Sequence, residues 1–188
     1  MSTPVIDVAL SREGDDDTLL ARARRGDEHA IDQLIRRYMD DVYSVTSRVL
    51  QDAELAQDAA QEALINALRA LHTFRGDASF RTWLLRIALN AARTLVRRQH
   101  HRREVALEAA ADVSSNDANA ASDVVMKDEA ERARRLLAQL PEKQRMAVTL
   151  RVNQGLSYQE IGSVLNCTEG AARVNYHLGV KRLRELAK

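Results

Sequence analysis

Residues 157–178, SYQEIGSVLNCTEGAARVNYHL, carry the most specific structural signal in this sequence. Ser157, with Glu160 three residues on, forms a capping box that predicts a short helix ending near Leu165. Asn166 tolerates left-handed backbone geometry and predicts a tight turn. Gly162 supplies a small residue where two steeply crossing helices touch. The stretch therefore predicts a helix–turn–helix, the motif that places its second helix in the major groove of DNA.

The second helix is expected to run from Glu169 to about Ala187 and to carry a polar face. Arg and Asn can make bidentate contacts with base edges. That face offers Arg173, Asn175 and His177, while Ala172 and Leu178 are expected to pack inward. Two ordinary helices of a bundle are the alternative. DNA binding is favoured because the turn, the cap, the small residue and the polar face agree.

Outward from this motif, charge divides the chain into four segments. The net charge is −3 over 1–16, +4 over 17–103, −5 over 104–128 and +5 over 129–188. The acidic segment is polar and lacks aromatic residues, which is typical of a flexible linker. We therefore expect an acidic N-terminal tail, a helical domain over 17–103, a linker over 104–128 and a second small helical domain over 129–188.

Capping residues and helix-breaking residues predict the helix boundaries in both domains. In the first, a short helix over 17–25 should end at Gly26, and Asp27, Asp52 and Ser79 should cap the next three helices. In the second, a helix over 128–139 is followed by one that has Pro141 at its first position and ends before Gly155. Few Gly and Pro residues and many Ala, Leu, Arg and Glu residues predict an all-α fold.

The first domain is polarised in charge. Residues 40–62 hold six acidic residues against Arg48, whereas 69–103 hold nine Arg against Asp77. The acidic helix is a candidate protein-binding surface, although a solvated face is the simpler alternative. The run Arg97-Arg98-Gln99-His100-His101-Arg102-Arg103 has no acid to pair with it, which favours contact with phosphates.

Three aromatic residues, Phe74, Phe80 and Trp83, accompany the basic helix. Aromatic side chains beside Arg can hold unstacked bases. Phe80 and Trp83 lie on the apolar face, however, so a core role is favoured for them. The polar loop over 75–79 is the better candidate for receiving a base from an opened duplex.

The sequence argues against several other classes. We find no Gly-rich phosphate loop and no metal-ligand spacing, so no enzyme activity, metal or cofactor is expected. The pair Asp15-Asp16 indicates helix-start or surface charge. Cys167 is the single cysteine, which fits a reducing cytoplasm, and no apolar run approaches the roughly 20 residues of a membrane span.

Two sets of motifs resemble extracytoplasmic-function sigma factors, group 4 of the sigma-70 family. The stretches DAAQEAL (58–64), FRGDASFRTWL (74–84), IALN (87–90) and Arg97-Arg98 resemble their region 2. The stretches LPEKQR (140–145), GLSYQEIG (155–162) and GAARV (170–174) resemble their region 4. The order and spacing match over about 17–103 and 129–188.

This resemblance implies a role in starting transcription and a set of contacts. Region 2 would bind the clamp helices of core RNA polymerase and open the −10 promoter element, and region 4 would read the −35 element and bind the polymerase flap. An anti-sigma factor is an expected partner, and membrane insertion is not expected. The implied polymerase-binding residues are Asp58, Gln61 and Glu62. The implied −10 residues are Arg75, Asp77, Ser79, Arg81, Asn90, Arg93, Arg97 and Arg98. The implied −35 residues are Thr168, Ala171, Arg173, Asn175, His177 and Lys181.

Two alternatives remain open at this point. A helix–turn–helix repressor or activator would bind duplex DNA without polymerase. A helical adaptor would have no DNA role, but the two basic segments argue against it.

Overall fold

The computed structural model describes residues 15–109 and 126–187. Within these ranges all regular structure is helical, which confirms the predicted all-α class. None of the helices described is long and apolar enough to cross a membrane. The elements are a helix over 15–23, α2 (Glu28–Leu50), α3 (Ala53–Arg69), the 3₁₀ turn η1 (Leu71–Thr73), α4 (Phe80–Ala109), α5 (Met126–Ala138), α6 (Glu142–Val152), α7 (Tyr158–Leu165) and α8 (Glu169–Leu186).

Side-chain caps begin the helices of the first part. The Asp27 carboxylate accepts hydrogen bonds from the backbone N–H groups of His29 and Ala30, and the Asp52 carboxylate accepts one from Leu55. The Ser79 hydroxyl accepts one from the backbone N–H of Thr82. These contacts satisfy N–H groups that have no partner within the helix, and they confirm all three predicted caps.

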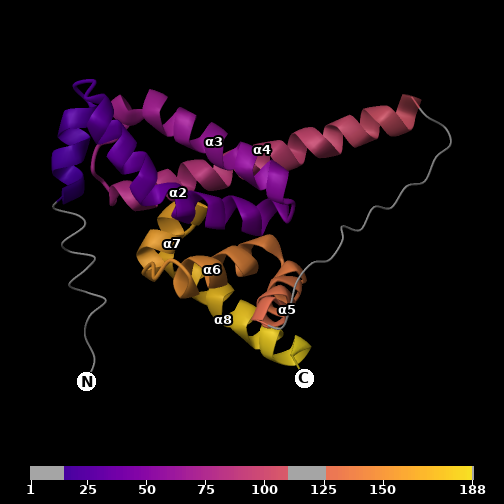
Figure 1. Ribbon diagram of the computed structural model, residues 1–188. Coiled ribbons are helices and arrows are strands. Elements are labelled where there is room, and N and C mark those ends of the chain that lie inside the picture. The colour runs from indigo at the N-terminus through magenta and orange to yellow at the C-terminus, as the bar shows by residue number, and fades with distance from the viewer. Residues whose placement is uncertain (1–14, 110–125, 188) are drawn as a thin grey trace, which may run out of the picture.

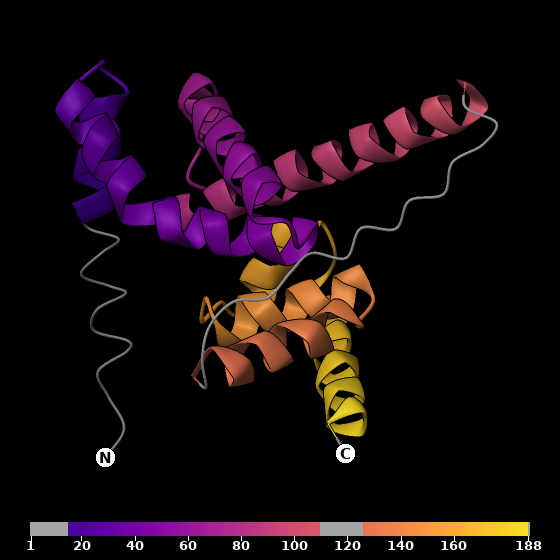
Figure 2. The same cartoon turned by 45° about the vertical axis from the view of Figure 1, so that its right-hand side comes forward.

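Helices α2, α3 and α4 pack against one another around an apolar core (Figure 1). Small residues of α3, including Ala59, Ala63 and Ala67, are buried and let the neighbouring helices approach closely. Figure 2 shows that α4 extends well beyond the bundle at its C-terminal end. The core follows from the 3.6-residue period of apolar residues that the sequence displays.

The helix over 15–23 begins two residues earlier than expected, so Asp15 and Asp16 belong to it rather than to the acidic tail. Asp16 is not surface charge, because only 5% of the residue is exposed. Its carboxylate accepts hydrogen bonds from the Tyr38 hydroxyl and from the Arg37 guanidinium. Two bonds from one helix thus compensate a buried acid on another and fix the short helix on α2.

The second part is built from α5 to α8, with α8 packed on α6 and α7. Pro141 stands one residue before the first helical position and not at it. Gly155 follows α6 with a φ of +67°, a left-handed conformation that suits glycine.

The segment expected as linker is shorter at both ends than predicted. Helix α5 begins two residues before the position expected for it, and α4 continues through the first six residues of the segment expected as linker. The middle of that segment, 110–125, lies outside the described residues.

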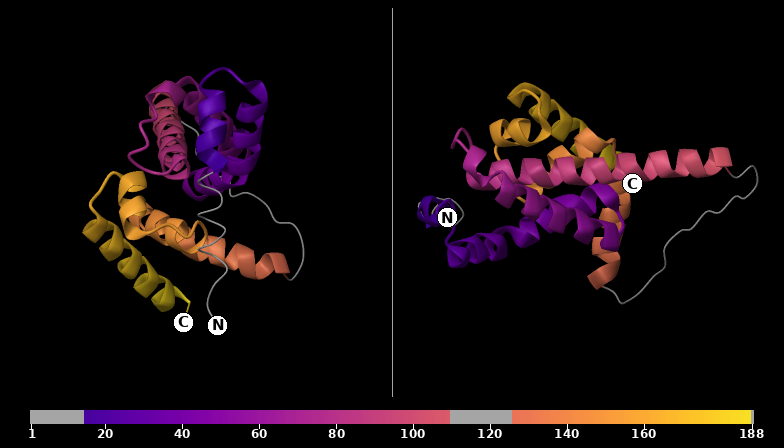
Figure 3. Two further views of the ribbon diagram at one scale, coloured as in Figure 1. Left: turned by 90° about the vertical axis from the view of Figure 1, so that its left-hand side faces the viewer. Right: turned by 90° about the horizontal axis from the view of Figure 1, so that it is seen from above.

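The two parts pack against each other (Figure 1 and Figure 3). Helix α7 lies against α4, and α6 lies against α2. Buried residues of α6 and α7, among them Leu150 and Ile161, join those of α2 and α4 in one continuous apolar cluster. The described structure is therefore closed, with the first helix of the helix–turn–helix held against the basic helix.

Candidate nucleic-acid interface

The polar loop before α4 presents two of its residues to solvent. Arg75 and Asp77 are exposed, and Gly76 has a φ of +83°, which turns the chain sharply. Ser79 is half-buried, and its hydroxyl is engaged with Thr82 through the backbone N–H at 3.2 Å and the side-chain oxygen at 2.9 Å. Ser79 thus begins the helix, while Arg75 and Asp77 are free to meet a ligand.

Arg81 lies at the junction of the two parts. Its Nε donates to the Asp41 carboxylate at 2.6 Å, and its terminal nitrogens donate to the backbone oxygen of Gln154, at 2.7 Å, and to the Gln154 side chain. All three acceptors are used in holding α2, α4 and the turn after α6 together. In this closed arrangement the Arg81 guanidinium donates its hydrogen bonds to other groups of the protein and not to DNA.

Two further contacts connect α4 to the second part. The Arg93 Nε donates to Glu142 at 2.7 Å, at the start of α6. The Thr82 hydroxyl lies 3.3 Å from Glu160, the residue that also closes the capping box of α7. The side of α4 that carries Arg81 and Arg93 therefore faces the second part, with α7 packed against α4 and the first residue of α6 bonded to Arg93.

The rest of the basic helix remains open. Asn90 is exposed beside a small pocket of about 200 Å³ between α3 and α4. Arg97 and Arg98 are exposed, and Arg98 lies 3.9 Å from Glu62 of α3. Arg97, Arg98 and the exposed Arg102 place three guanidinium groups within two turns of one helix, which suits a phosphate backbone. The side chain of Arg103 lies outside the described residues.

The aromatic residues pack on one another instead of facing solvent. Phe80 is 8% exposed, and its ring lies 5.6 Å from the rings of Tyr38, Phe74 and Trp83. Arg24 lies over the Phe74 ring, 5.7 Å from its centre, and donates to the Phe74 backbone oxygen. These contacts confirm the core role predicted for Phe80 and Trp83.

The helix–turn–helix has the predicted local geometry. Ser157 and Glu160 form the reciprocal capping box, and Asn166 ends α7 with φ 55° and ψ 55°. A Cβ placed on Gly162 would lie 2.8 Å from the backbone oxygen of Cys167. Only glycine fits at this crossing, so Gly162 and Asn166 together set the angle between α7 and α8.

The exposed face of α8 carries Arg173, His177 and Lys181. Arg173 forms an ion pair with Glu169 at 2.8 Å and lies over the Tyr158 ring, 5.2 Å from its centre. Its guanidinium is thus held at the surface, near the beginning of the helix, where base edges are reached by such motifs.

Other residues expected on this face are placed differently. Asn175 is half-buried, and its amide donates to the backbone oxygen of Ala171 at 2.8 Å, so it lies away from the exposed side. Thr168 is the N-cap of α8 and accepts from the backbone N–H of Ala171. The prediction that Leu178 packs inward is wrong, because 47% of the residue is exposed. Gly179 takes the inward position, where a Cβ would meet Val148 at 2.8 Å.

The acidic face of α3 lies on the opposite side of that helix from its buried alanines. Asp58 and Gln61 are exposed, and Glu62 is half-exposed. Residues at positions i, i+3 and i+4 lie together on a helix surface. The three side chains therefore form one polar patch that is open to a partner.

Some site residues could not be found from sequence. Gln154, Glu142 and Glu160 hold the two parts together, and each has a separate local explanation as a helix-end residue. Tyr158, which lies beneath the guanidinium groups of both Arg151 and Arg173, gave no periodic signal. Contacts between residues that are far apart in the chain arise from the closed packing of the two parts, and they leave no short-range pattern in the sequence.

Comparisons with known proteins agree on both parts of the chain. The family description Sigma-70 region 2 matches residues 34–102, and Sigma-70, region 4 matches residues 130–183. The RNA polymerase sigma-H factor of Pseudomonas aeruginosa is 39% identical over 166 residues, which cover 84% of this chain and 86% of that protein. The ECF RNA polymerase sigma-E factor of Escherichia coli K12 is 36% identical over 172 residues, covering 87% of this chain and 90% of that protein.

Solved structures show the same fold. The structure of CnrH in complex with the cytosolic domain of CnrY has a TM-score of 0.70 at 24% identity, covering 92% of this chain and 96% of that one. The sigma factor RpoE of Bartonella quintana, in complex with the anti-sigma factor NepR, has a TM-score of 0.66 at 21% identity, covering 83% of this chain and 95% of that one.

Proposed function

The chain belongs to the extracytoplasmic-function RNA polymerase sigma factors of the sigma-70 family, and from this membership we propose how its surfaces direct core polymerase to promoters. The single observation that carries the proposal is the pairing of two matched regions, in order, with two helical parts. Residues 17–103 act as the polymerase-binding and −10 domain, 129–188 as the −35 domain and 104–128 as the tether. The alternative of a repressor or activator is not favoured by this membership.

The polymerase contact is assigned to the polar patch of Asp58, Gln61 and Glu62 on α3. This patch is open, and its acidic character suits a basic partner surface. Glu62→Lys should weaken binding of core polymerase by about tenfold or more while the fold is retained, because surface changes usually cost little stability. Affinity is measured by fluorescence anisotropy of the labelled chain titrated with core polymerase.

The matched control is Asp32→Lys, which reverses a charge on the outer face of α2, where Asp32 pairs with Arg36. Equal losses for both variants would indicate a general charge effect and contradict the assignment. Unchanged affinity for Glu62→Lys would contradict it as well.

The −10 contact is assigned to the loop over 75–79 and to α4. Arg75 and Asp77 would meet the opened strand, and Asn90, Arg97 and Arg98 would follow its backbone. Arg93 would join them only after its bond to Glu142 breaks, and Arg81 only after its bonds to Gln154 and Asp41 break. Ser79 contributes by holding the start of the helix.

The −35 contact is assigned to the start of α8. The side chains that face solvent there are Arg173, His177 and Lys181. Arg173 would break its ion pair with Glu169 and contact a base edge instead. Asn175 would have to leave the Ala171 carbonyl to take part. Thr168 and Ala171, at the N-terminal end of the helix, suit contact with the DNA backbone.

Binding by an anti-sigma factor completes the proposal. The Bartonella quintana RpoE structure, which shares this fold, holds the anti-sigma factor NepR. We place the chain in the cytoplasm because core polymerase works there, and we assign it no enzymatic activity or cofactor. A gel-shift assay with promoter duplex, with and without core polymerase, separates a sigma factor, which requires polymerase, from a repressor.

A further inference from the structure

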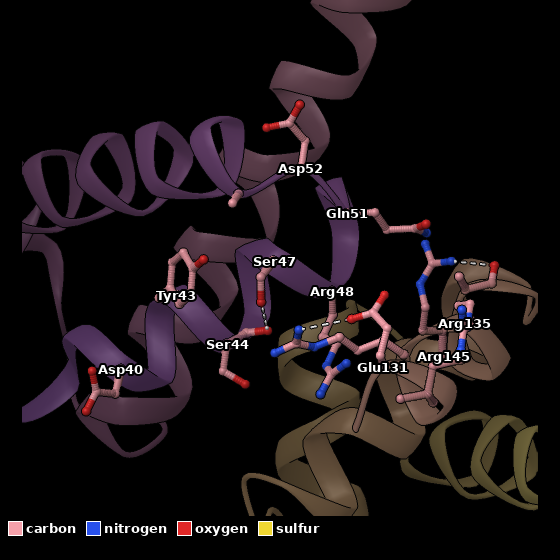
Figure 4. A pocket seen from close by; sticks show the side chains of 14 residues that line it. Asp40, Tyr43, Ser44, Ser47, Arg48, Gln51, Asp52, Glu131, Arg135 and Arg145 are labelled. Atoms are coloured by element: carbon pink, nitrogen blue, oxygen red, sulfur yellow. Dashed lines mark hydrogen bonds and ion pairs between the residues drawn. The ribbon is translucent and has the colours of Figure 1, made fainter. Parts of the chain in front are cut away.

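A second cavity lies between the two parts, on the side away from α7. It measures about 480 Å³, and α2 and the turn after it form one wall while α5 and α6 form the other. In Figure 4 the side chains of Arg48, Glu131 and Arg145 are drawn between these walls. Its volume lies within the range of about 300–1,000 Å³ that is usual for small-molecule sites.

Four arginines line this cavity: Arg48, Arg134, Arg135 and Arg145. Three acids also line it, but two of them are engaged. Asp52 caps α3, and Glu131 pairs with Arg134 at 3.4 Å. The cavity therefore combines an excess of guanidinium groups with little free carboxylate.

Arg48 is the least compensated of these cations. It is half-buried, and among the described residues no carboxylate lies within ion-pair distance of it. Burial lowers the pKa of Arg48, and the nearby charge of Arg134 lowers it further. Two like charges from different parts of the chain thus approach across the cavity, and Glu131, which pairs with Arg134 at 3.4 Å, offsets only one of them.

Arg145 adds to this imbalance from the α6 side. One terminal nitrogen donates to the backbone oxygens of Ala138 and Leu140 at 3.2 and 3.4 Å, so the side chain is held in place. Its Nε is buried and has no hydrogen-bond partner. Burial lowers the pKa of Arg145 as well, and Glu142 opposes this only in part.

We propose that this cavity binds a small phosphate-bearing anion, of about the size of a nucleoside diphosphate, that bridges Arg48 of the first part and Arg134 of the second. A guanidinium group can donate two parallel hydrogen bonds to two oxygens of a phosphate group. A single carboxylate has fewer oxygens and would leave more of the guanidinium N–H groups in the cavity without an acceptor. Tyr43 and Leu137 supply apolar surface beside the arginines. Because the anion contacts both parts, its binding stabilises the closed arrangement.

Isothermal titration calorimetry of the full chain at low salt, with GDP and separately with inorganic pyrophosphate, tests the proposal. We expect one saturable site. Tighter binding of GDP would indicate that the nucleoside also contacts the cavity, and equal binding would indicate that the phosphates suffice. Arg48→Gln and Arg134→Gln should each weaken binding by roughly tenfold or more, as for a lost hydrogen bond between charged groups.

Arg36→Gln is the matched control, since Arg36 lies on the exposed face of the same helix as Arg48 and loses the same charge. It should bind the anion as the unchanged chain does. Circular dichroism and the melting temperature establish that each variant is folded, and the largely exposed Arg134 provides a variant with little structural risk. The bridging site would be overturned if neither anion gave saturable heat, or if Arg36→Gln lowered the affinity as much as the other variants do. It would also be overturned if only one of Arg48→Gln and Arg134→Gln lowered the affinity.

Discussion

A single buried carboxylate fixes the N-terminal helix of this protein. Asp16 accepts hydrogen bonds from Tyr38 and Arg37, and so compensates its own burial. The sequence could indicate a helix start at Asp15-Asp16 but could not indicate its partners. They lie about 20 positions further along the chain, and no local pattern links them.

The Tyr38 hydroxyl should contribute to stability, since it donates to a buried acid. Tyr38→Phe should lower the free energy of unfolding by about 1–3 kcal/mol at neutral pH, because Asp16 loses one of its two donors. Burial and the bond to Asp16 raise the pKa of Tyr38. A raised pKa means that this contribution is present below about pH 10, the usual tyrosine value, and is lost as the pH rises above it.

Urea denaturation between pH 7 and pH 11 measures both effects. Tyr43→Phe is the control on the same helix, because Tyr43 is 40% exposed. It should change stability little. Equal stability of Tyr38→Phe and the unchanged chain would show that the hydroxyl of Tyr38 contributes nothing.

At the scale of elements, the crossing of α7 and α8 depends on one glycine. A Cβ on Gly162 would approach the Cys167 backbone oxygen to 2.8 Å, whereas a Cβ on Gly170, at the start of α8, would meet nothing within 4 Å. The two positions lie in the same motif and differ in their surroundings. They therefore separate the effect of close packing from that of helix propensity.

Gly162→Ala should destabilise the protein by about 1–3 kcal/mol, as overpacking does. Gly170→Ala should leave stability unchanged or raise it by up to about 1 kcal/mol, because alanine favours a helix. Thermal unfolding of the two variants provides the measurement. The crossing argument would be contradicted if both variants had the stability of the unchanged chain.

Much of this motif could be predicted from sequence, because its determinants are local. The capping box at Ser157 and the left-handed Asn166 depend on neighbouring residues, and both are as expected. The sequence wrongly predicts an inward Leu178 because the helical period allows two inward positions near the end of the contact. The approach of Val148 makes Gly179 the one that fits.

At the scale of the whole molecule, the closed packing covers part of the basic helix. Arg81 and Arg93 are bonded to Gln154 and Glu142 of the second part. Charge segregation could predict two basic parts joined by an acidic segment, but not their contact. That contact joins residues 49 to 73 positions apart.

The double variant Glu142→Ala, Gln154→Ala removes the side-chain acceptors that the second part offers to Arg93 and Arg81, and should loosen this packing without altering α4. Release of Arg93, and weaker attachment of Arg81 to the second part, should strengthen binding of single-stranded DNA by the free chain by several-fold, with a steeper dependence on salt. Arg81 keeps its bonds to Asp41 and to the Gln154 backbone oxygen. Fluorescence anisotropy with a labelled oligonucleotide, without polymerase, measures the affinity. An affinity and a salt dependence equal to those of the unchanged chain would show that the contacts do not restrict access.

If this chain gives core RNA polymerase its choice of promoter, transcription should start at sites that depend on it. Transcription of genomic DNA by core polymerase, with and without the chain, followed by mapping of the start sites, measures this dependence. We expect a defined set of start sites that requires the chain. Arg173→Ala should lower their use by roughly tenfold to a hundredfold without abolishing polymerase binding, as for a lost base contact. Start sites that are the same with and without the chain would show that the chain does not direct promoter choice.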